Sequence, residues 1–222
     1  PTTFTGIYMN ENTLPVAREG LPFIALFAFV TFIFALLSWG FLSFVALLLT
    51  LFVVYFFRDP ERHCPADEGA VISPADGKVV FVGDVMEERF FKEEVQKVSI
   101  FMSVFNVHVN RAPCSGKVLD VYYNKGEFFN ADLDKASLQN EQSGIYMQTE
   151  SGPNILFVQV AGLIARRIIS YPKVGDILKK AQRYGLIRFG SRVDIYLPKG
   201  TDIHVKIGDR TVAGETVVGL LQ

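Results

Sequence analysis

The sequence predicts a mainly β protein, in which a barrel-sandwich-like β domain follows an N-terminal membrane helical hairpin. Half of the 222 residues are hydrophobic, and the stretch from Gly20 to Phe57 contains no charged residue. Beyond it come short β-branched segments bounded by Gly, Pro, Asn or Asp, which are typical of strands. Two similar turns, Val174-Gly175-Asp176 and Ile207-Gly208-Asp209, recur late in the chain. Such apolar-Gly-Asp turns are typical of the corners of barrel-sandwich folds, so this repeat favours that architecture.

The apolar stretch is predicted to form two helices. One helix over residues 20–57 would extend well beyond the ~30 Å hydrocarbon core of a bilayer, whereas two of about 17 residues would each just cross it. Ser38-Trp39-Gly40 provides the break between them. A hairpin buried in the core of a soluble protein is the alternative.

Positive residues on both sides of the hairpin favour placing both of its ends on the cytoplasmic side of the cell (inner) membrane. These residues are Arg18, Arg58 and Arg62. We therefore expect a polar lead-in over residues 1–19, the hairpin over residues 20–57 and a cytoplasmic catalytic β domain over residues 58–222.

The strand pattern of the β domain follows from alternation and turn residues. Residues 177–184 carry a weak helical pattern, and residues 137–143 are polar enough to predict a long loop. The segments predicted as strands are 70–73, 78–82, 98–104, 117–123, 155–160, 164–170, 192–197 and 203–207.

Charge and cysteine content exclude several classes of function. The formal net charge of -1 gives no basic patch for nucleic acid. Cys64 and Cys114 are the two cysteines, too few for a disulfide scaffold and without the spacing of a metal site. We expect no bound metal and two reduced thiols.

Gly190-Ser191 can support an unusual reaction of the backbone. With no Cβ on Gly190, the chain can bend so that the Ser191 hydroxyl reaches the preceding carbonyl carbon. Attack would turn the amide into an ester, and elimination followed by hydration would leave a pyruvoyl group at position 191. Such a ketone can accept electrons as pyridoxal phosphate does. Alone, a Gly-Ser pair before a strand is usually only a turn.

Four motifs that occur in a fixed order accompany the Gly190-Ser191 pair. Together they resemble the phosphatidylserine decarboxylase family, in particular its short bacterial and archaeal branch. The resemblance covers residues 58–222. It rests on Ser73-Pro74-Ala75-Asp76-Gly77-Lys78-Val79, on Phe105-Asn106-Val107-His108-Val109-Asn110-Arg111-Ala112-Pro113, on Asn140-Glu141 and on Arg188-Phe189-Gly190-Ser191.

The resemblance implies an activity and a cofactor. The chain would cut itself between residues 190 and 191, and the two resulting chains would stay associated. A covalent pyruvoyl group (pyruvate) derived from Ser191 would form a Schiff base with phosphatidylserine, a membrane phospholipid, and release carbon dioxide and phosphatidylethanolamine. The sequence leaves room for a homo-oligomer.

The resemblance also implies roles for individual residues. His108 would transfer protons and, with Asp76, activate the Ser191 hydroxyl. Longer relatives carry a second histidine where this chain has Arg111, so the base for self-cleavage stays open. Taken alone, Asp76 is a good β-turn residue and a single strand histidine is more often structural. Four residues are candidates for binding the substrate: Arg111, Asn140, Glu141 and Arg188.

Two other classes of function compete with this interpretation. Asp134-Lys135-Ala136 matches the tripeptide around a lipoylated lysine, so the β domain could be a lipoyl or biotinyl carrier, or an efflux adaptor. A lipid-binding anchor protein without catalytic activity is the third class.

Overall fold

The structure is a computed structural model, and it describes residues 14–67, 69–126, 140–162, 167–188 and 190–221. The chain forms two compact units that divide between Glu61 and Arg62. The first unit is helical, and the second is the β unit.

The helical unit is an antiparallel pair. A short 3-10 helix, Arg18–Gly20, leads into α1 (Leu21–Leu36), and α2 spans Gly40–Phe56. The Thr31 and Thr50 hydroxyl oxygens lie 3.0 Å apart and link the two helices. Most of the Leu and Phe side chains on these helices are exposed. Arg18–Leu36 is long and apolar enough to cross a membrane, whereas the apolar helix α2 is shorter.

The β unit confirms the prediction of a mainly β fold. Its strands are β1 (Ala70–Ile72), β2 (Gly77–Glu87), β3 (Glu93–Met102), β4 (Val109–Arg111), β5 (Gly116–Lys125), β6 (Glu141–Thr149), β7 (Asn154–Ala161), β8 (Ile168–Ser170), β9 (Ile177–Leu178), β10 (Arg183–Ile187), β11 (Ser191–Leu197), β12 (Asp202–Ile203), β13 (Arg210–Thr211) and β14 (Val217–Leu220).

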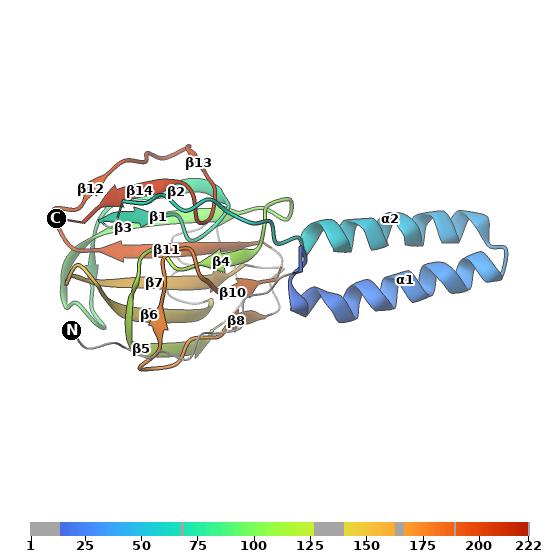
Figure 1. The fold of residues 1–222 in the computed structure, drawn as a ribbon, viewed down its shortest axis with the longest axis horizontal. Helices are drawn as coiled ribbons and strands as arrows, with labels where there is room; N and C mark the ends of the chain where they lie inside the picture. Colours follow the sequence, from blue (N-terminus) through green and yellow to red (C-terminus); the bar gives the residue numbers. More distant parts are fainter. Residues whose placement is uncertain (1–13, 68, 127–139, 163–166, 189, 222) are drawn as a thin grey trace. The chain divides into compact units, whose positions relative to one another are not determined.

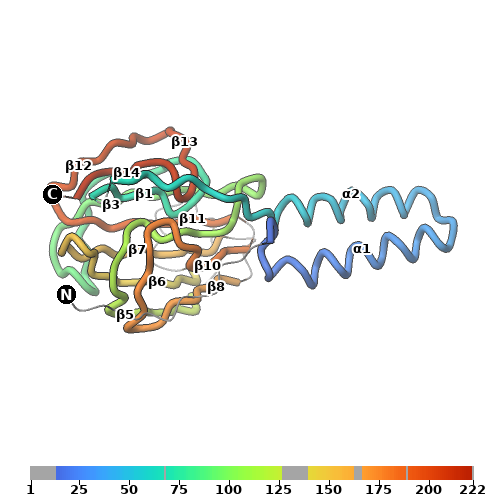
Figure 2. Tube along the Cα trace, in the orientation of Figure 1, coloured from blue at the N-terminus to red at the C-terminus, as the bar shows by residue number. Residues whose placement is uncertain are grey.

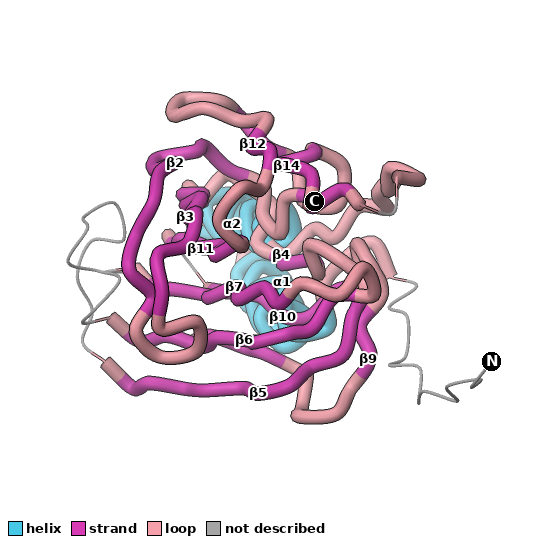
Figure 3. The backbone as a smooth tube through the Cα atoms, turned by 90° about the vertical axis from the view of Figure 1, so that its left-hand side faces the viewer, coloured by secondary structure: helices cyan, strands magenta, loops and turns pink. Residues whose placement is uncertain are grey.

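One curled antiparallel sheet dominates this unit, in the strand order β13-β2-β3-β11-β7-β6-β5-β9 (Figures 1 and 3). Smaller sheets, β1-β14-β12 and β4-β10-β8, complete it. Strand β11 lies in the middle of the large sheet, paired with β3 on one side and β7 on the other (Figure 2). Alternate residues of these strands face the core, where Ile100, Phe157 and Val193 are fully buried.

The two apolar-Gly-Asp turns make the same contacts in the two halves of the large sheet. In each turn, the glycine amide donates to the carbonyl oxygen of a strand valine. The amide of the same valine donates to the carbonyl oxygen of the turn aspartate. The valines are Val118 of β5 for Val174-Gly175-Asp176 and Val79 of β2 for Ile207-Gly208-Asp209, with distances of 2.8 to 2.9 Å. The sequence repeat therefore reflects an internal structural repeat.

Three sequence predictions need correction. Residues 177–184 form no helix: β9 ends at Leu178, Ala181 takes a positive φ of 64° in a turn, and β10 begins at Arg183. Pairing with β4 and β8 outweighs the weak helical pattern there. Residues 141–143 belong to β6 rather than to a loop, and 203–207 is strand only at Ile203. The strand predicted over 164–170 is found at Ile168–Ser170, and 163–166 lie outside the described residues.

Candidate active site

Gly190 and Ser191 stand where the chain enters β11. Ser191 is fully buried and pairs with Met102 of β3 and Ala161 of β7. Gly190 has a φ of +56°, in the left-handed region that side-chain-bearing residues seldom adopt. A Cβ on Gly190 would meet no atom of the described residues within 4 Å, so the backbone conformation, not space, favours glycine here.

The carbonyl group of Gly190 is held by a hydrogen bond at the end of the β7–β11 ladder. The Gly162 amide donates to its oxygen at 3.0 Å. The other end of the same peptide group, the carbonyl oxygen of Ala161, accepts a 2.7 Å hydrogen bond from the side chain of Asn140, which is fully buried. Asn140, a sequence-predicted site residue, thus lies on the side of β7 away from Ser191 and reaches it through this one peptide group.

The Ser191 hydroxyl faces a neutral, buried environment. It donates weakly to the Met102 sulfur at 3.5 Å, and the Asn110 side-chain amide lies 3.6 Å from the same sulfur. Gln159 in turn donates to the Asn110 side-chain oxygen at 2.9 Å. These three side chains around Ser191 are buried and uncharged.

His108 precedes β4 and is almost fully buried. Its Nδ1 lies 2.9 Å from the Asn106 carbonyl oxygen. Because a carbonyl oxygen only accepts, this bond places a proton on Nδ1 and leaves Nε2 of the neutral ring as the basic atom. The Ile187 amide donates to the His108 carbonyl oxygen at 3.4 Å, which fixes His108 beside the strand that leads to Gly190.

Asp76 is held by partners that the sequence did not indicate. Arg62 Nη2 lies 3.1 and 2.9 Å from its two carboxylate oxygens, and the Ala213 amide donates to Oδ1 at 2.8 Å. Among the described residues, no hydrogen bond joins Asp76 to His108. The turn before Asp76 is instead bonded to β4, the strand that follows His108: Arg111 N donates to the Pro74 carbonyl oxygen at 2.9 Å, and the Asn110 side chain lies 3.5 Å from the same oxygen.

The remaining candidates surround this end of the sheet. Arg111 is buried and donates to the Ala181 carbonyl at 3.3 Å, on the other side of β4 from Asn110. Glu141 accepts from the Tyr123 hydroxyl at 2.7 Å, a bond that raises the pKa of Tyr123. Arg188 is half-buried two residues before Gly190, and Phe189 lies outside the described residues.

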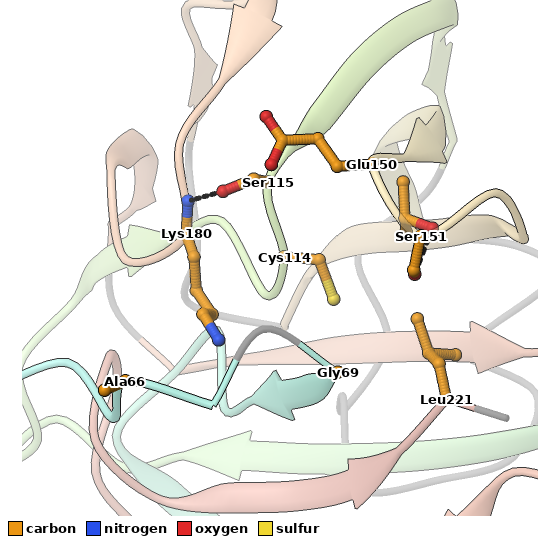
Figure 4. A pocket seen from close by; sticks show the side chains of 9 residues that line it. Ala66, Gly69, Cys114, Ser115, Glu150, Ser151, Lys180 and Leu221 are labelled. Carbon is orange, nitrogen blue, oxygen red and sulfur yellow. Dashed lines mark hydrogen bonds between the residues drawn. The ribbon is translucent and has the colours of Figure 1, made fainter.

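A cavity of about 280 Å³ lies at the opposite end of the sheet, beside Thr149 at the end of β6. Figure 4 shows side chains that line it, among them Cys114 and Lys180. The cavity is also lined by Ser115, and the Lys180 amide donates to the Ser115 hydroxyl at 3.0 Å. Burial raises the pKa of Cys114 to about 12, against the opposing effect of the nearby Lys180 charge. None of the predicted site residues lines this cavity.

Sequence reasoning missed Met102, Gln159, Gly162 and Arg62. Gln159 left a signal, as a polar residue inside the otherwise apolar run Ile155–Ala161. The others left none, because their contacts join strands that are distant in sequence. In the part of the chain that the structure describes, no group of three His, Cys, Asp or Glu side chains could hold a metal ion.

Comparison with known proteins agrees with these motifs. Residues 49–219 match the phosphatidylserine decarboxylase family. The chain is 61% identical over 214 residues to the phosphatidylserine decarboxylase proenzyme of Syntrophotalea carbinolica, which covers 96% of this chain and 100% of that protein. It is 54% identical over 212 residues to the proenzyme of the same name from Geotalea uraniireducens, covering 96% and 99%. The chain therefore belongs to the phosphatidylserine decarboxylase family.

Proposed function

We propose that this chain is a proenzyme that cuts itself between Gly190 and Ser191 and then converts phosphatidylserine to phosphatidylethanolamine and carbon dioxide. The names of its relatives support this reaction and do not support the carrier alternative. Lys135, on which that alternative depends, lies outside the described residues. The observation that carries the proposal is the buried Ser191 hydroxyl next to a left-handed Gly190 whose carbonyl oxygen already has a hydrogen-bond donor.

Self-cleavage needs three steps at Ser191. The hydroxyl oxygen attacks the Gly190 carbonyl carbon, the peptide C–N bond breaks, and the freed amine takes a proton, which leaves an ester. Removal of the Ser191 Cα proton then eliminates the Gly190 carboxylate and leaves dehydroalanine. Its imine tautomer reacts with water and releases ammonia, so that residue 191 ends as a pyruvoyl group.

The surroundings of Ser191 fit a pyruvoyl group. Among the described residues, the Ser191 side chain contacts the Met102 thioether, which neither adds to a ketone nor competes for it as an amine would. A pyruvoyl group at position 191 would supply a ketone for the lipid amine and an acceptor for the electrons released with carbon dioxide. Strand β11 stays paired with β3 and β7, so residues 191–222 remain bound to residues 1–190 after cleavage.

We assign proton transfer to His108. Its Nδ1 is bonded to the Asn106 carbonyl, so Nε2 is the atom that takes or delivers a proton. Asp76 contributes to self-cleavage by holding the turn that β4 packs against, since its carboxylate is committed to Arg62 and Ala213. Because this chain has Arg111 where longer relatives carry a second histidine, His108 serves both self-cleavage and decarboxylation.

The substrate phosphate is assigned to Arg188. A guanidinium group matches phosphate geometry, and Arg188 is half-buried two residues before Gly190. Arg111 is a weaker candidate because it is buried against the Ala181 carbonyl. Glu141, with Tyr123, would help shape the head-group site.

The helical unit is proposed to hold the enzyme at its substrate. The exposed Leu and Phe side chains of α1 and α2 are those that lipid would cover, and the flanking arginines lie just before α1 and just after α2. We propose a membrane hairpin over residues 20–57 and a cytoplasmic catalytic domain over residues 58–222. Sodium carbonate washing of membranes should leave the protein in the pellet, and its release into the wash would contradict this anchor.

Mass spectrometry of the purified protein tests the self-cleavage directly. We expect two chains, residues 1–190 and 191–222, with a blocked N-terminus on the shorter one. Reduction in the presence of phosphatidylserine should tether the lipid amine to the shorter chain. Ser191→Ala should stay uncut, because it lacks the attacking oxygen. A single intact chain in active protein would overturn the proposal.

A further inference from the structure

The peptide group between Ala161 and Gly162 connects Asn140 to the bond that is cut. Its carbonyl oxygen accepts from the Asn140 side chain at 2.7 Å, and its amide donates to the Gly190 carbonyl oxygen at 3.0 Å. The two hydrogen bonds therefore lie in series through one conjugated amide. Neither bond involves the substrate site to which the family resemblance assigned Asn140.

The Gly190 carbonyl oxygen is the atom on which negative charge develops when Ser191 attacks. A donor that is already in place before the reaction stabilises this charge without reorganisation, and loss of one such donor slows acyl transfer about 10² to 10³-fold. The Gly162 amide is in that position in the uncut chain. It follows Ala161, which pairs with Ser191 in the last β7–β11 pair among the described residues.

Asn140 supports this donor from the opposite end of the same peptide group. A hydrogen bond to the carbonyl oxygen of an amide polarises the amide and strengthens its N–H as a donor. Asn140 is fully buried, so its bond to the Ala161 carbonyl forms away from competing water. The side chain reaches it from the residue that precedes β6, the strand next to β7.

We propose that Asn140 is a positioning residue for self-cleavage, acting through the Ala161–Gly162 peptide group as the donor for the tetrahedral oxyanion at Gly190. This inference rests on the proposed self-cleavage and adds a role that the substrate-binding assignment does not include. Among the described residues, the Asn140 side chain bonds to Ala161 and makes no hydrogen bond to Gly190 or Ser191, so its expected effect is on the rate of processing.

The test compares two variants of the full-length precursor that differ in whether residue 140 can donate a hydrogen bond to the Ala161 carbonyl oxygen. Asn140→Leu has a similar shape and no donor at any pH. Asn140→Asp lacks a donor when ionised but has an O–H to donate when protonated. Processing is followed as the rate at which residues 191–222 appear by mass spectrometry, between pH 5.5 and pH 9.

Both variants should process about tenfold more slowly than the unaltered chain at pH 9. As the pH falls, Asn140→Asp should recover to within about threefold of the unaltered chain, whereas Asn140→Leu should not. Because both variants keep His108, the ratio of their rates removes the pH dependence of the base. Because a buried carboxylate also destabilises the fold when it ionises, the melting temperature of each variant is measured over the same pH range, and processing rates that only follow the melting temperature would indicate a merely structural role.

Asn154→Asp is the matched control. Asn154 begins β7, at the far end from Ala161, and donates to the Tyr146 hydroxyl at 2.8 Å. It should process at the unaltered rate throughout. If a variant fails to fold, Asn140→Ala replaces it, with the expectation given for Asn140→Leu.

Unaltered processing rates in the Asn140 variants, or a constant ratio between Asn140→Asp and Asn140→Leu across the pH range, would overturn the inference. Ser191→Ala separates this failure from failure of the proposed function. If Ser191→Ala is uncut while the Asn140 variants process normally, only the role of Asn140 is lost. If Ser191→Ala is itself cut at this bond, the self-cleavage proposal is wrong.

Discussion

Asp76 and Ser115 occupy equivalent positions in the two halves of the β unit. Asp76 accepts from the Ala213 amide at 2.8 Å, and Ser115 accepts from the Lys180 amide at 3.0 Å. Each precedes a Gly-Lys-Val sequence that begins β2 or β5. The hydrogen bond from the backbone amide is therefore part of the repeated fold. The ion pair with Arg62 is made by Asp76 and not by Ser115, and it lies at the end of the large sheet that holds Ser191.

Removing the Arg62–Asp76 ion pair should destabilise the protein. Asp76→Asn and Arg62→Met should each lower the free energy of unfolding by about 1 to 2 kcal/mol, because both side chains are only 13% exposed. The double variant should lose less than the sum, since both changes break one contact. Thermal melting in detergent measures these effects, and strict additivity would contradict the coupling.

Ser115→Ala separates the structural part of this arrangement from any effect on processing. It removes the equivalent hydrogen bond, from the Lys180 amide to the Ser115 hydroxyl, at the opposite end of the sheet. We expect a loss of about 1 kcal/mol in stability with normal self-cleavage. Slow processing in Ser115→Ala would show that any loss of stability, at either end, affects cleavage.

Gly190→Ala should slow processing more than it destabilises the fold. The cost of a left-handed alanine is about 1 to 2 kcal/mol, and the added methyl would meet no atom of the described residues within 4 Å. Relief of this strain would turn the carbonyl away from the Gly162 amide. Gly200→Ala is the control, because Gly200 has a φ of +91° and equal space. Equal processing rates for the two variants would contradict the prediction.

The sequence indicated the proposed reacting groups but not the residues that hold them in place. Gly190-Ser191 and His108 stand in short motifs, so neighbouring residues were enough to predict self-cleavage at the first and proton transfer by the second. The donor at Gly162 and the partner of Asp76 at Arg62 depend on strand pairing and packing between distant segments. No local pattern encodes such contacts.

The errors in strand assignment have a related cause. Glu141, Gln142 and Ser143 are polar, which suggested a loop, yet all three are buried in β6. Tyrosine hydroxyls from β5 lie within hydrogen-bonding distance of Glu141 and Gln142, at 2.7 and 3.5 Å. Polar residues can therefore occupy a buried strand when the neighbouring strand supplies partners, which a single-sequence pattern does not reveal.

The two cysteines should differ sharply in reactivity. Cys64 is exposed, whereas burial raises the pKa of Cys114 to about 12, so very little of it is thiolate at pH 8. Iodoacetamide should label only Cys64 in the folded protein and both in urea. Equal labelling of the folded protein, measured by peptide mass spectrometry, would be inconsistent with this burial.

Burial of Cys114 also predicts a loss of stability at high pH. The unfolded thiol ionises near its ordinary pKa of 9.0, whereas the folded thiol ionises near 12. Between these values the folded state binds more protons, so its stability is unaffected below about pH 9 and falls as the pH rises. Cys114→Ala should reduce the fall of the melting temperature with rising pH. An unchanged fall would show that other groups cause it.

Replacing His108 should stop both reactions. With Nδ1 bonded to the Asn106 carbonyl, Nε2 is the basic atom near the β10 segment that leads to Ser191, and Arg111 cannot act as a base. His108→Ala should leave a folded precursor with no 191–222 chain and no release of carbon dioxide. His204→Ala is the control, because His204 is 40% exposed and bonded to Asp202. If His108→Ala processes normally but releases no carbon dioxide, a different group is the base for self-cleavage and His108 acts only on the lipid.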